Sequence, residues 1–349
     1  MKPPLGPSAI QEVIGRLAEL LDLAPVERSG SPVESGADAI LDLGGYTFVI
    51  EWKSSGAAAH VSMAAEQVRR HAADLDAEAV PLVAVPFMGP VGRARCEDAG
   101  VGWLDLSGNA RIVAPGVRVL IEGQPNRFKG AGRPLSAFAP KSARIARWLL
   151  MHPDRSMTQR EIARATVMDE GFTSRIVARL EDDNLIVRDS KGAIRVRDPN
   201  LLLDAWSEDY DFSKHRILGA HLAARSGDSL LRLLVQRLTA GHVQYAVTGL
   251  AAAWLFTRFA GFRIVTVFAS EQPQRELLEV LGLREEERGA NVWLVAPNDE
   301  GVLHGAADHD GVRCVHPVQA YLDLRGHPER SKEAADELRA QLLTWRSDG

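Results

Sequence analysis

Cysteine is scarce in this sequence of 349 residues, which contains only Cys96 and Cys314. The two lie far apart and form no CxxC pair, so neither a disulfide framework nor a cysteine-based zinc site is available. Cysteine use this low is typical of proteins from a reducing compartment. We therefore expect a cytoplasmic protein.

Long hydrophobic runs are also missing. The longest apolar stretches, such as residues 247–256, span about ten residues, whereas a membrane helix needs about 20. The N-terminus, Met1-Lys2-Pro3-Pro4, is not followed by the apolar region of a signal peptide. We expect no membrane span and no export signal. No internal repeat is visible either.

The overall composition is that of an ordinary globular protein, with 46% hydrophobic and 25% charged residues. These proportions argue against disorder, and the length suggests two or three domains. The net charge of −5, from 41 basic and 46 acidic residues, does not by itself indicate nucleic-acid binding.

The distribution of charge is less even than its total. Residues 111–147 contain eight basic residues and one acidic residue, Glu122. A surface that faces phosphates has this composition, and so has a solvated basic linker. Charge alone leaves both interpretations open.

Glycine and proline divide the chain into segments. Residues 124–140 combine Gly, Pro, Arg and Lys without apolar periodicity, which predicts a basic linker. A softer break follows around residues 198–214. We therefore predict a first domain over 1–123, a second over 141–205 and a third over 206–349.

The first domain is predicted to be α/β with a mixed sheet. Its apolar patterns and turn residues indicate helices and strands in alternation. The expected elements are a helix over 8–23, a hairpin of 38–43 and 46–53 joined by Gly44-Gly45, a helix over 62–75, a strand over 81–86, a helix over 89–99, and strands over 101–106 and 110–113.

Two carboxylates and a lysine mark the ends of the predicted hairpin strands. Asp38 leads the first strand, and Glu51-Trp52-Lys53 ends the second. Residues i and i+2 of a strand share a face, so Glu51 and Lys53 point the same way and Asp38 can converge on them. Paired carboxylates bind Mg²⁺ or Mn²⁺, which can activate water against a phosphodiester with help from the lysine ammonium. The alternative is an ion pair without catalytic meaning.

This pattern resembles the D…ExK core of the restriction-endonuclease-like nucleases, most closely the archaeal-type Holliday junction resolvases. Asp38 and Glu51 would be the metal ligands, and Lys53 the catalytic lysine. The resemblance further implies a catalytic glutamate on the preceding helix, at Glu12 or else Glu19, and a supporting glutamine on the following helix, at Gln67. The tyrosine that usually follows this glutamine is replaced by His71. Because resolvase-like domains commonly pair, a homodimer is expected.

Two further polar residues of the first domain allow two readings. Asp105 and Asn109 flank a Ser-Gly turn, where they could serve a function or merely form a hairpin. We favour the hairpin, because Asn and Gly tolerate the positive φ of tight turns.

The second domain has the element order of a winged helix. Helices are expected from residue 141 to His152-Pro153, from Thr158 as N-cap with Glu161 completing a capping box, and over 170–182, followed by a hairpin of 184–188 and 193–197. The region resembles MarR-like bacterial winged helices, although such folds also bind proteins.

Double-stranded DNA is the predicted partner of this winged helix. The third helix is expected to present polar residues to the major groove, and the hairpin to present basic residues to phosphates. The predicted contacts are Thr173, Ser174, Arg175 and Arg179 on the helix and Lys191, Arg195 and Arg197 on the wing.

The third domain is again predicted to be α/β. Residues 245–253 resemble the glycine turn of minimal nucleotidyltransferases, but the following strand, 263–269, lacks the paired aspartates that would bind metal. We therefore expect a degenerate, non-catalytic domain. Asp308, His309 and Asp310 suggest a metal site less than they suggest a polar loop.

The end of the chain resembles another family. Residues 314–324 and the predicted helix 331–345 are similar to the C-terminal part of AbiEi-family antitoxins of type IV toxin–antitoxin systems. The resemblance implies a repressor of its own operon with a cognate toxin as partner. In that family the winged helix usually lies near the N-terminus, whereas here another domain precedes it.

Two interpretations of the whole chain follow, and we favour the first. In the first, a metal-dependent nuclease domain is delivered to DNA by the winged helix. In the alternative, the chain is a non-enzymatic AbiEi-like transcriptional regulator whose first domain only binds DNA or a partner. A scaffold that binds no nucleic acid is a third interpretation, and it predicts no salt-dependent affinity for DNA.

Overall fold

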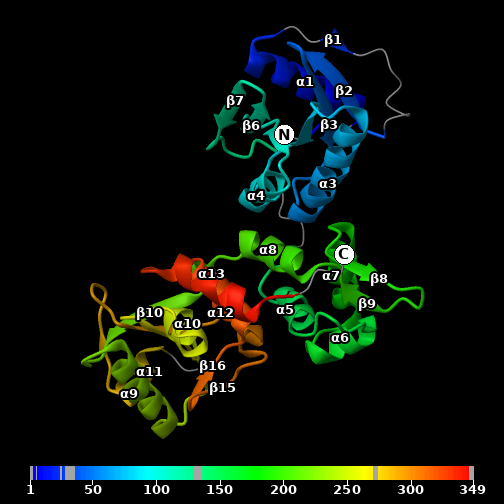
Figure 1. Cartoon of the computed structure of the whole chain (residues 1–349). Helices are drawn as coiled ribbons and strands as arrows, with labels where there is room; N and C mark the ends of the chain where they lie inside the picture. The colour runs from blue at the N-terminus through cyan, green and yellow to red at the C-terminus, as the bar shows by residue number, and fades with distance from the viewer. Residues whose placement is uncertain are drawn as a thin grey trace. The chain divides into compact units, whose positions relative to one another are not determined.

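The computed structural model of the protein describes residues 3–4, 6–23, 26–27, 36–128, 136–269 and 274–345 (Figure 1). The chain divides into two compact units. The first comprises Met1–Pro134 with Asp182–Leu185, and the second comprises Leu135–Glu181 with Ile186–Gly349. Residues 129–135 of the expected linker lie outside the described residues. None of the helices in the described ranges combines the length and the apolar composition that a membrane span requires.

The first unit is built on a mixed sheet of seven strands that follow one another in chain order. Strands β3, β4 and β5 are parallel, and the other neighbours are antiparallel. The strands are β1 (Val26–Glu27), β2 (Ala39–Leu43), β3 (Tyr46–Trp52), β4 (Val80–Val85), β5 (Gly102–Asp105), β6 (Ala110–Ala114) and β7 (Val117–Ile121).

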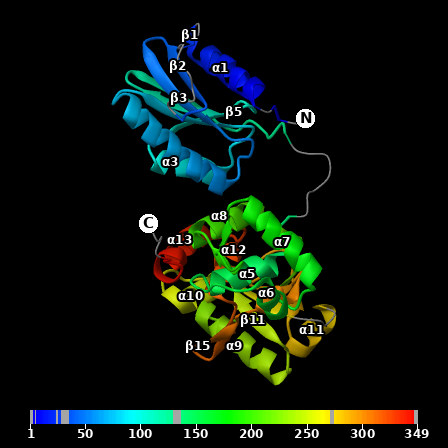
Figure 2. The same ribbon diagram turned by 90° about the vertical axis from the view of Figure 1, so that its right-hand side faces the viewer.

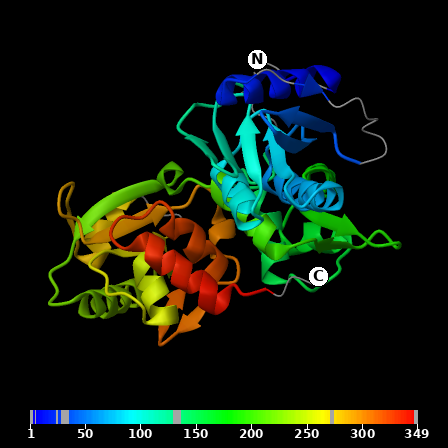
Figure 3. The same cartoon turned by 45° about the horizontal axis from the view of Figure 1, so that its top comes forward.

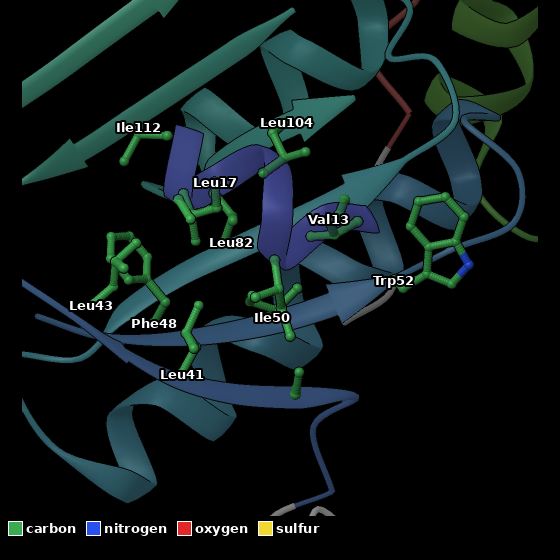
Figure 4. Packing of buried hydrophobic residues seen from close by; sticks show 14 of the residues in the cluster. Val13, Leu17, Leu41, Leu43, Phe48, Ile50, Trp52, Leu82, Leu104 and Ile112 are labelled. Atoms are coloured by element: carbon green, nitrogen blue, oxygen red, sulfur yellow. The ribbon is translucent and has the colours of Figure 1, made fainter. Parts of the chain in front are cut away.

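Helices cover both faces of this sheet (Figure 2). Helix α1 (Pro7–Leu21) packs on one face, while α3 (Ala58–Leu75) and α4 (Pro90–Asp98) pack on the other. The two parallel connections run through α3 and α4, as a parallel pair requires a crossover. In Figure 4, Val13 and Leu17 of α1 lie over Leu82 of the sheet. The predicted α/β architecture with a mixed sheet is confirmed for this unit.

The side-chain alternation along β3 decides where its polar end points. Phe48 and Ile50 pack in the core beneath α1, and Val49 packs in the core beneath α3. Because successive strand residues face opposite sides, Glu51 shares the α3 side with Val49.

The second unit begins with three helices and a hairpin, which are labelled in Figure 1; the hairpin is also visible in green in Figure 3. These are α5 (Ala143–Met151), α6 (Gln159–Ala165) and α7 (Glu170–Asp182), followed by β8 (Ile186–Arg188) and β9 (Ile194–Val196). The backbone at Met157 forms an antiparallel bridge to Ile194, so a third segment of backbone lies beside the hairpin. Thr158 and Glu161 form the predicted capping box at the start of α6. The predicted order of elements is confirmed.

Helix α8 (Pro199–Asp209) connects this region to a second mixed sheet of seven strands. Their order is β13-β10-β14-β12-β11-β16-β15. The strands are β10 (Arg216–His221), β11 (Tyr245–Thr248), β12 (Val265–Ala269), β13 (Arg284–Glu285), β14 (Val292–Ala296), β15 (Ala307–His309) and β16 (Val312–Cys314); the helices are α9 (Gly227–Ala240), α10 (Gly249–Thr257), α11 (Gln274–Leu281), α12 (Pro317–Leu324) and α13 (Ser331–Leu342), with short 3-10 turns at Phe212–Lys214 and Glu300–Leu303.

Candidate functional site

Helix α7 presents a polar face that differs from the predicted one at a single residue. Ser174, Arg175 and Arg179 are exposed, as expected. Thr173, in contrast, is 0% exposed, and its hydroxyl donates to the carbonyl of Asp169 at 2.9 Å. The prediction of an exposed Thr173 was wrong.

The helical period explains the burial of Thr173. Residues three, four and seven positions apart lie on one face of a helix, and Thr173 stands at these spacings before Ile176, Val177 and Leu180. All three of these are buried. Thr173 therefore belongs to the inner stripe of α7 and cannot reach a DNA base.

Aromatic contact organises the exposed face of α7 near its start. The Arg175 guanidinium lies 5.6 Å from the centre of the Phe172 ring, and the Lys141 ammonium lies 5.9 Å from the same centre. Such contacts limit the freedom of both basic side chains without removing their charge. Both cations thus lie against a single ring of α7.

The wing displays its basic residues on one side. Ile194 and Val196 are buried, while Arg195, Arg197 and Lys191 are exposed. Among the described residues, none of these three basic side chains forms an ion pair. Their donors are therefore available to phosphate oxygens.

The turn of the wing is fixed by its own side chain and backbone. The Asp189 carboxylate accepts hydrogen bonds from the backbone N–H groups of Lys191 and Ala193, at 2.8 and 2.9 Å. Gly192 has a φ of 79°, which favours glycine. The tip is therefore preorganised.

In the first unit, the structure brings together Asp38, Glu51 and Lys53. The Lys53 ammonium donates to Glu51 Oε1 at 2.6 Å. Asp38 lies just before β2 and beside the end of β3, where its Oδ2 accepts from the backbone N–H of Trp52 at 2.8 Å. The predicted convergence of the three side chains is therefore present in the fold.

Glu51 is the buried member of this group, with 2% of its surface exposed. Burial raises the pKa of its carboxyl, the nearby Asp38 raises it further, and Lys53 and His71 oppose the shift. Among the described residues, Glu51 Oε2 has no hydrogen-bond partner. A buried carboxylate oxygen without a partner is unusual and often marks a functional site.

Glu12 and Gln67 are not joined to this group. Glu12 is exposed on α1 and lines a separate pocket of about 550 Å³, together with Glu19, Arg16 and Arg127. Among the described residues, no hydrogen bond connects Gln67 to Asp38, Glu51 or Lys53.

His71 is the neighbour that the sequence did not assign to the site. Its Nε2 lies 3.1 Å from where a Cβ on Gly36 would stand, so it packs against the chain just before Asp38. The spacing in the sequence could have indicated this position, because His71 follows Gln67 by four residues and so shares its helix face.

The carboxylates fit a metal only in part. Two carboxylates suffice for a Mg²⁺ ion that keeps several waters, and Asp38 and Glu51 offer them. Across the described ranges, no group of three or more His, Cys, Asp or Glu side chains is placed to hold a metal ion. The structure therefore offers two carboxylates to a hydrated ion and, in the part of the chain that it describes, no third protein ligand.

Asp105 and Asn109 build the hairpin that the sequence favoured. Asp105 is fully buried, and its carboxylate accepts from the backbone N–H groups of Met88, Gly108 and Asn109 and from the Asn109 amide, at 2.8 to 3.0 Å. The Asn109 side-chain amide also donates to the carbonyl of Gln124 and accepts from its backbone N–H. The pair fixes the turn.

The C-terminal glycine turn is present, and within the described ranges no group of three or more His, Cys, Asp or Glu side chains is placed around it to hold a metal ion. Gly249 has a φ of 61° at the start of α10, next to Thr248 on β11 and Thr266 on β12. Asp310 pairs with Arg258, and the Asp308 carboxylate accepts from the backbone N–H of Gly311, as in a polar loop. A nucleotidyltransferase-like fold remains a prediction.

Comparisons with known proteins assign the second unit. Residues 138–195 match the model of the MarR family, and residues 195–344 match a model described as "Transcriptional regulator, AbiEi antitoxin, Type IV TA system". The chain contains a MarR-type winged helix and a C-terminal AbiEi domain. No curated protein and no solved structure is significantly similar to it. A restriction-endonuclease-like fold for residues 1–123 is not confirmed and stays a prediction.

The two family matches support a DNA-binding transcriptional regulator or antitoxin more than they support a nuclease. The prediction of a winged helix is confirmed. The preference for a nuclease over a transcriptional regulator, which the sequence alone suggested, is not supported by these matches.

Proposed function

We propose that this protein is a cytoplasmic, DNA-binding transcriptional regulator that acts as the antitoxin of a type IV toxin–antitoxin system and represses its own operon. The observation that carries the proposal is the exposed basic face of α7 and the wing, in a segment similar to the MarR family and followed by one similar to AbiEi antitoxins. A cognate toxin would be the protein partner.

The geometry gives each exposed residue a role in DNA binding. Ser174, Arg175 and Arg179 stand on the face of α7 that would enter the major groove, where side-chain donors and acceptors read base edges. Arg195, Arg197 and Lys191 would contact phosphates, which fix the register of the protein on the duplex. Occupation of an operator would then block transcription.

The test is binding of the full-length protein to a labelled duplex of its own upstream region, measured by fluorescence anisotropy at several salt concentrations. Arg195→Ala should weaken binding to all sequences and reduce the salt slope by about one phosphate contact. Arg175→Ala should cost about 1–3 kcal/mol and relax sequence preference, because it removes a base contact.

The matched control is Arg263→Ala. Arg263 is an arginine of the C-terminal domain whose side chain is 89% exposed, so its replacement removes the same charge away from the winged helix. Equal losses in all three variants would contradict the proposed interface. Binding that does not respond to salt would contradict DNA recognition through phosphates.

A homodimer is part of this proposal, since regulators with a winged helix commonly bind paired half-sites. Sedimentation of the protein at micromolar concentration should give twice the mass of one chain. A monomer at that concentration would contradict it.

A metal-dependent nuclease is a second candidate function, favoured by the buried Glu51 carboxylate whose Oε2 has no partner among the described residues. Asp38 and Glu51 would hold a hydrated Mg²⁺ or Mn²⁺ ion, which supplies Lewis-acid activation of water or of the phosphodiester. Lys53, bonded to Glu51, would orient the attacking water and balance charge at phosphorus.

Cleavage assays decide between the two candidates. Linear, supercoiled and branched DNA are incubated with wild-type protein and with Lys53→Ala, each in Mg²⁺, Mn²⁺ or EDTA. Cleavage that requires metal and disappears in the variant would establish the nuclease. DNA binding without cleavage, unchanged by Lys53→Ala and by EDTA, is the outcome expected of a regulator.

A further inference from the structure

A buried arginine lies where the winged helix meets the C-terminal domain. Arg147 of α5 is 2% exposed, and its guanidinium lies 5.0 Å from the centre of the Trp206 ring. Its Nη2 donates to Gln319 Oε1 at 2.5 Å, whereas Nε and Nη1 have no hydrogen-bond partner among the described residues. A buried cation with so few partners depends strongly on each of them.

Gln319 links Arg147 to a buried carboxylate, that of Asp323. Its amide Nε2 donates to Asp323 Oδ1 at 2.7 Å and to the Tyr210 hydroxyl at 3.0 Å. Asp323 also accepts hydrogen bonds from the hydroxyls of Tyr210 and Thr248. Arg147, Gln319 and Asp323, which we call the buried relay, thus connect α5 to α12 and to β11.

Helix α5 in turn supports the parts of the winged helix that face DNA. It packs against α6 and β9. The indole N–H of Trp148 lies 3.2 Å from the Met157 sulfur, and Met157 pairs with Ile194 of the wing. Lys141, just before α5, lies over the Phe172 ring of α7. A shift of α5 would therefore move the wing and α7 together.

We propose that Arg147, Gln319 and Asp323 are positioning residues for DNA binding: the buried relay fixes α5 against the C-terminal domain, so that the affinity of the winged helix for DNA depends on the state of that domain. The inference rests on the proposed function and deepens it. It gives the C-terminal domain a defined mechanical route by which a bound partner would alter DNA binding.

The charge of Asp323 is the variable element of the relay. As a carboxylate it accepts three hydrogen bonds, and it is a counter-charge for Arg147. Protonation would turn one of its oxygens into a donor and force Thr248 or Tyr210 to reorient. Burial raises the pKa of Asp323 to about 6, and hydrogen bonds from Thr248, Tyr210 and Gln319 limit the rise.

The other titratable groups around Asp323 keep their charge state between pH 5.5 and 7.5. Burial lowers the pKa of Arg147 to about 10 and that of His215 to about 4, and it raises the pKa of Tyr210. His215 Nδ1 accepts from the N–H of Asn298, so its Nε2 carries the proton of the neutral ring and donates to Tyr210. Within this range, only Asp323 changes charge in the relay.

The experiment measures the Kd of the full-length protein for a short labelled duplex of random sequence by fluorescence anisotropy, with urea unfolding of each variant in parallel. Gln319→Leu keeps the side-chain size but breaks the relay, and it should weaken binding at pH 7.5 by at least about fivefold, which corresponds to about 1 kcal/mol. The control is Thr266→Val, which removes a buried hydrogen bond to His327 that does not reach α5. It should leave the Kd within about twofold even where its loss of stability is similar.

The pH profile supplies a readout that a merely structural role would not change. Asp323→Asn should bind more weakly than wild type at pH 7.5 and equally well at pH 5.5, where most wild-type Asp323 is protonated. A constant ratio of the two affinities across this range would overturn the relay. So would a Gln319→Leu variant that binds as tightly as wild type. If Gln319→Leu does not fold, Asp323→Asn carries the comparison alone.

Failure of the proposed function can be recognised separately. If wild-type protein binds no duplex at low salt, the regulator proposal is overturned, and the relay is then judged by hydrogen exchange. In that case Gln319→Leu should accelerate exchange in α5 and α7 relative to Thr266→Val, and equal exchange would overturn the relay as well.

Discussion

Thr173 and Ser174 are adjacent residues of α7 with opposite surroundings, and they allow a sharp test of the proposed DNA face. The buried Thr173 hydroxyl donates to the Asp169 carbonyl, whereas Ser174 is exposed. Thr173→Val keeps the size of the side chain but removes its hydrogen bond to Asp169, which should lower the stability by about 1 kcal/mol. Because no contact to a base is lost, the DNA affinity should stay within about twofold. Anisotropy titrations of this variant check it, and a tenfold loss of affinity without unfolding would place Thr173 at the DNA after all.

Asp105 is the residue on which the β5–β6 turn depends. Its two carboxylate oxygens accept four hydrogen bonds in a site without solvent. Asp105→Asn replaces one acceptor oxygen by a donor, which would face N–H groups, and should destabilise the first unit by about 3 kcal/mol. Hydrogen exchange of residues 102–114 should accelerate accordingly. Asp98→Asn, at the exposed end of α4, is the control that should leave this exchange unchanged.

At the residue scale, the sequence predicts best where the period of the backbone is simple. The two-residue repeat of a strand placed Glu51 and Lys53 on one face, and the hairpin brought Asp38 beside them. The phase of a helix is harder to judge, which is why Thr173 was assigned to the wrong face. The burial of Arg147 could not be predicted, because its partner Gln319 lies 172 residues further along the chain.

At the scale of elements, the capping box of α6 could be predicted because its two residues, Thr158 and Glu161, are only three positions apart in the sequence. Thr158 accepts from the Glu161 N–H at 3.2 Å, and the Glu161 carboxylate accepts from the Thr158 N–H at 2.7 Å. Thr158→Ala should lower the free energy of unfolding by about 1 kcal/mol, because the backbone N–H of Glu161 loses its acceptor and the Glu161 carboxylate loses the Thr158 hydroxyl. Urea unfolding measures the change. Thr239→Ala, late in α9 and away from any N-cap, is the control and should cost less.

Strands β7 and β10 were not predicted from the sequence, each for a different reason. The outer strand β7 follows β6 closely, but its residues alternate between exposed and half-buried, so it lacks a clear apolar run. Strand β10 pairs with β14, about 76 residues later, as in Leu218 opposite Leu294. Local patterns carry no information about such partners, whereas the hairpin of β2 and β3 needed only its Gly-Gly turn.

At the scale of the whole molecule, the winged helix and the AbiEi domain form one compact unit, although the two family matches meet at residue 195. Arginines make the connection. Arg144 forms a bidentate ion pair with Asp299, at 2.7 and 2.9 Å, and Arg147 of α5 donates to Gln319 of α12 at 2.5 Å. Because these links are partly buried, the DNA-binding and C-terminal parts are expected to unfold together.

The stability of this unit should fall on acidification, and the buried His215 and His327 with the half-buried His316 give the sign. Burial lowers the pKa of His215, His316 and His327 to about 4 each, so these rings stay neutral in the fold but take up protons on unfolding below about pH 6.5. Their stabilisation is present above pH 6.5 and is lost as the pH falls towards 4. Asp323 acts in the opposite sense, because its pKa is raised to about 6 and it releases a proton on unfolding.

Near pH 5, the three histidines outweigh Asp323, and unfolding takes up about two protons net, which makes the free energy of unfolding fall by about 2–3 kcal/mol per pH unit. Urea unfolding at pH 7, 6 and 5 measures this slope. His327→Gln removes one of the three titrating rings, which contacts Thr266 and Trp293. It should therefore reduce the net proton uptake from about two to about one and the slope by roughly half. A stability that rises between pH 7 and 5, or a slope that the variant leaves unchanged, would show that these histidines are not held neutral by the fold.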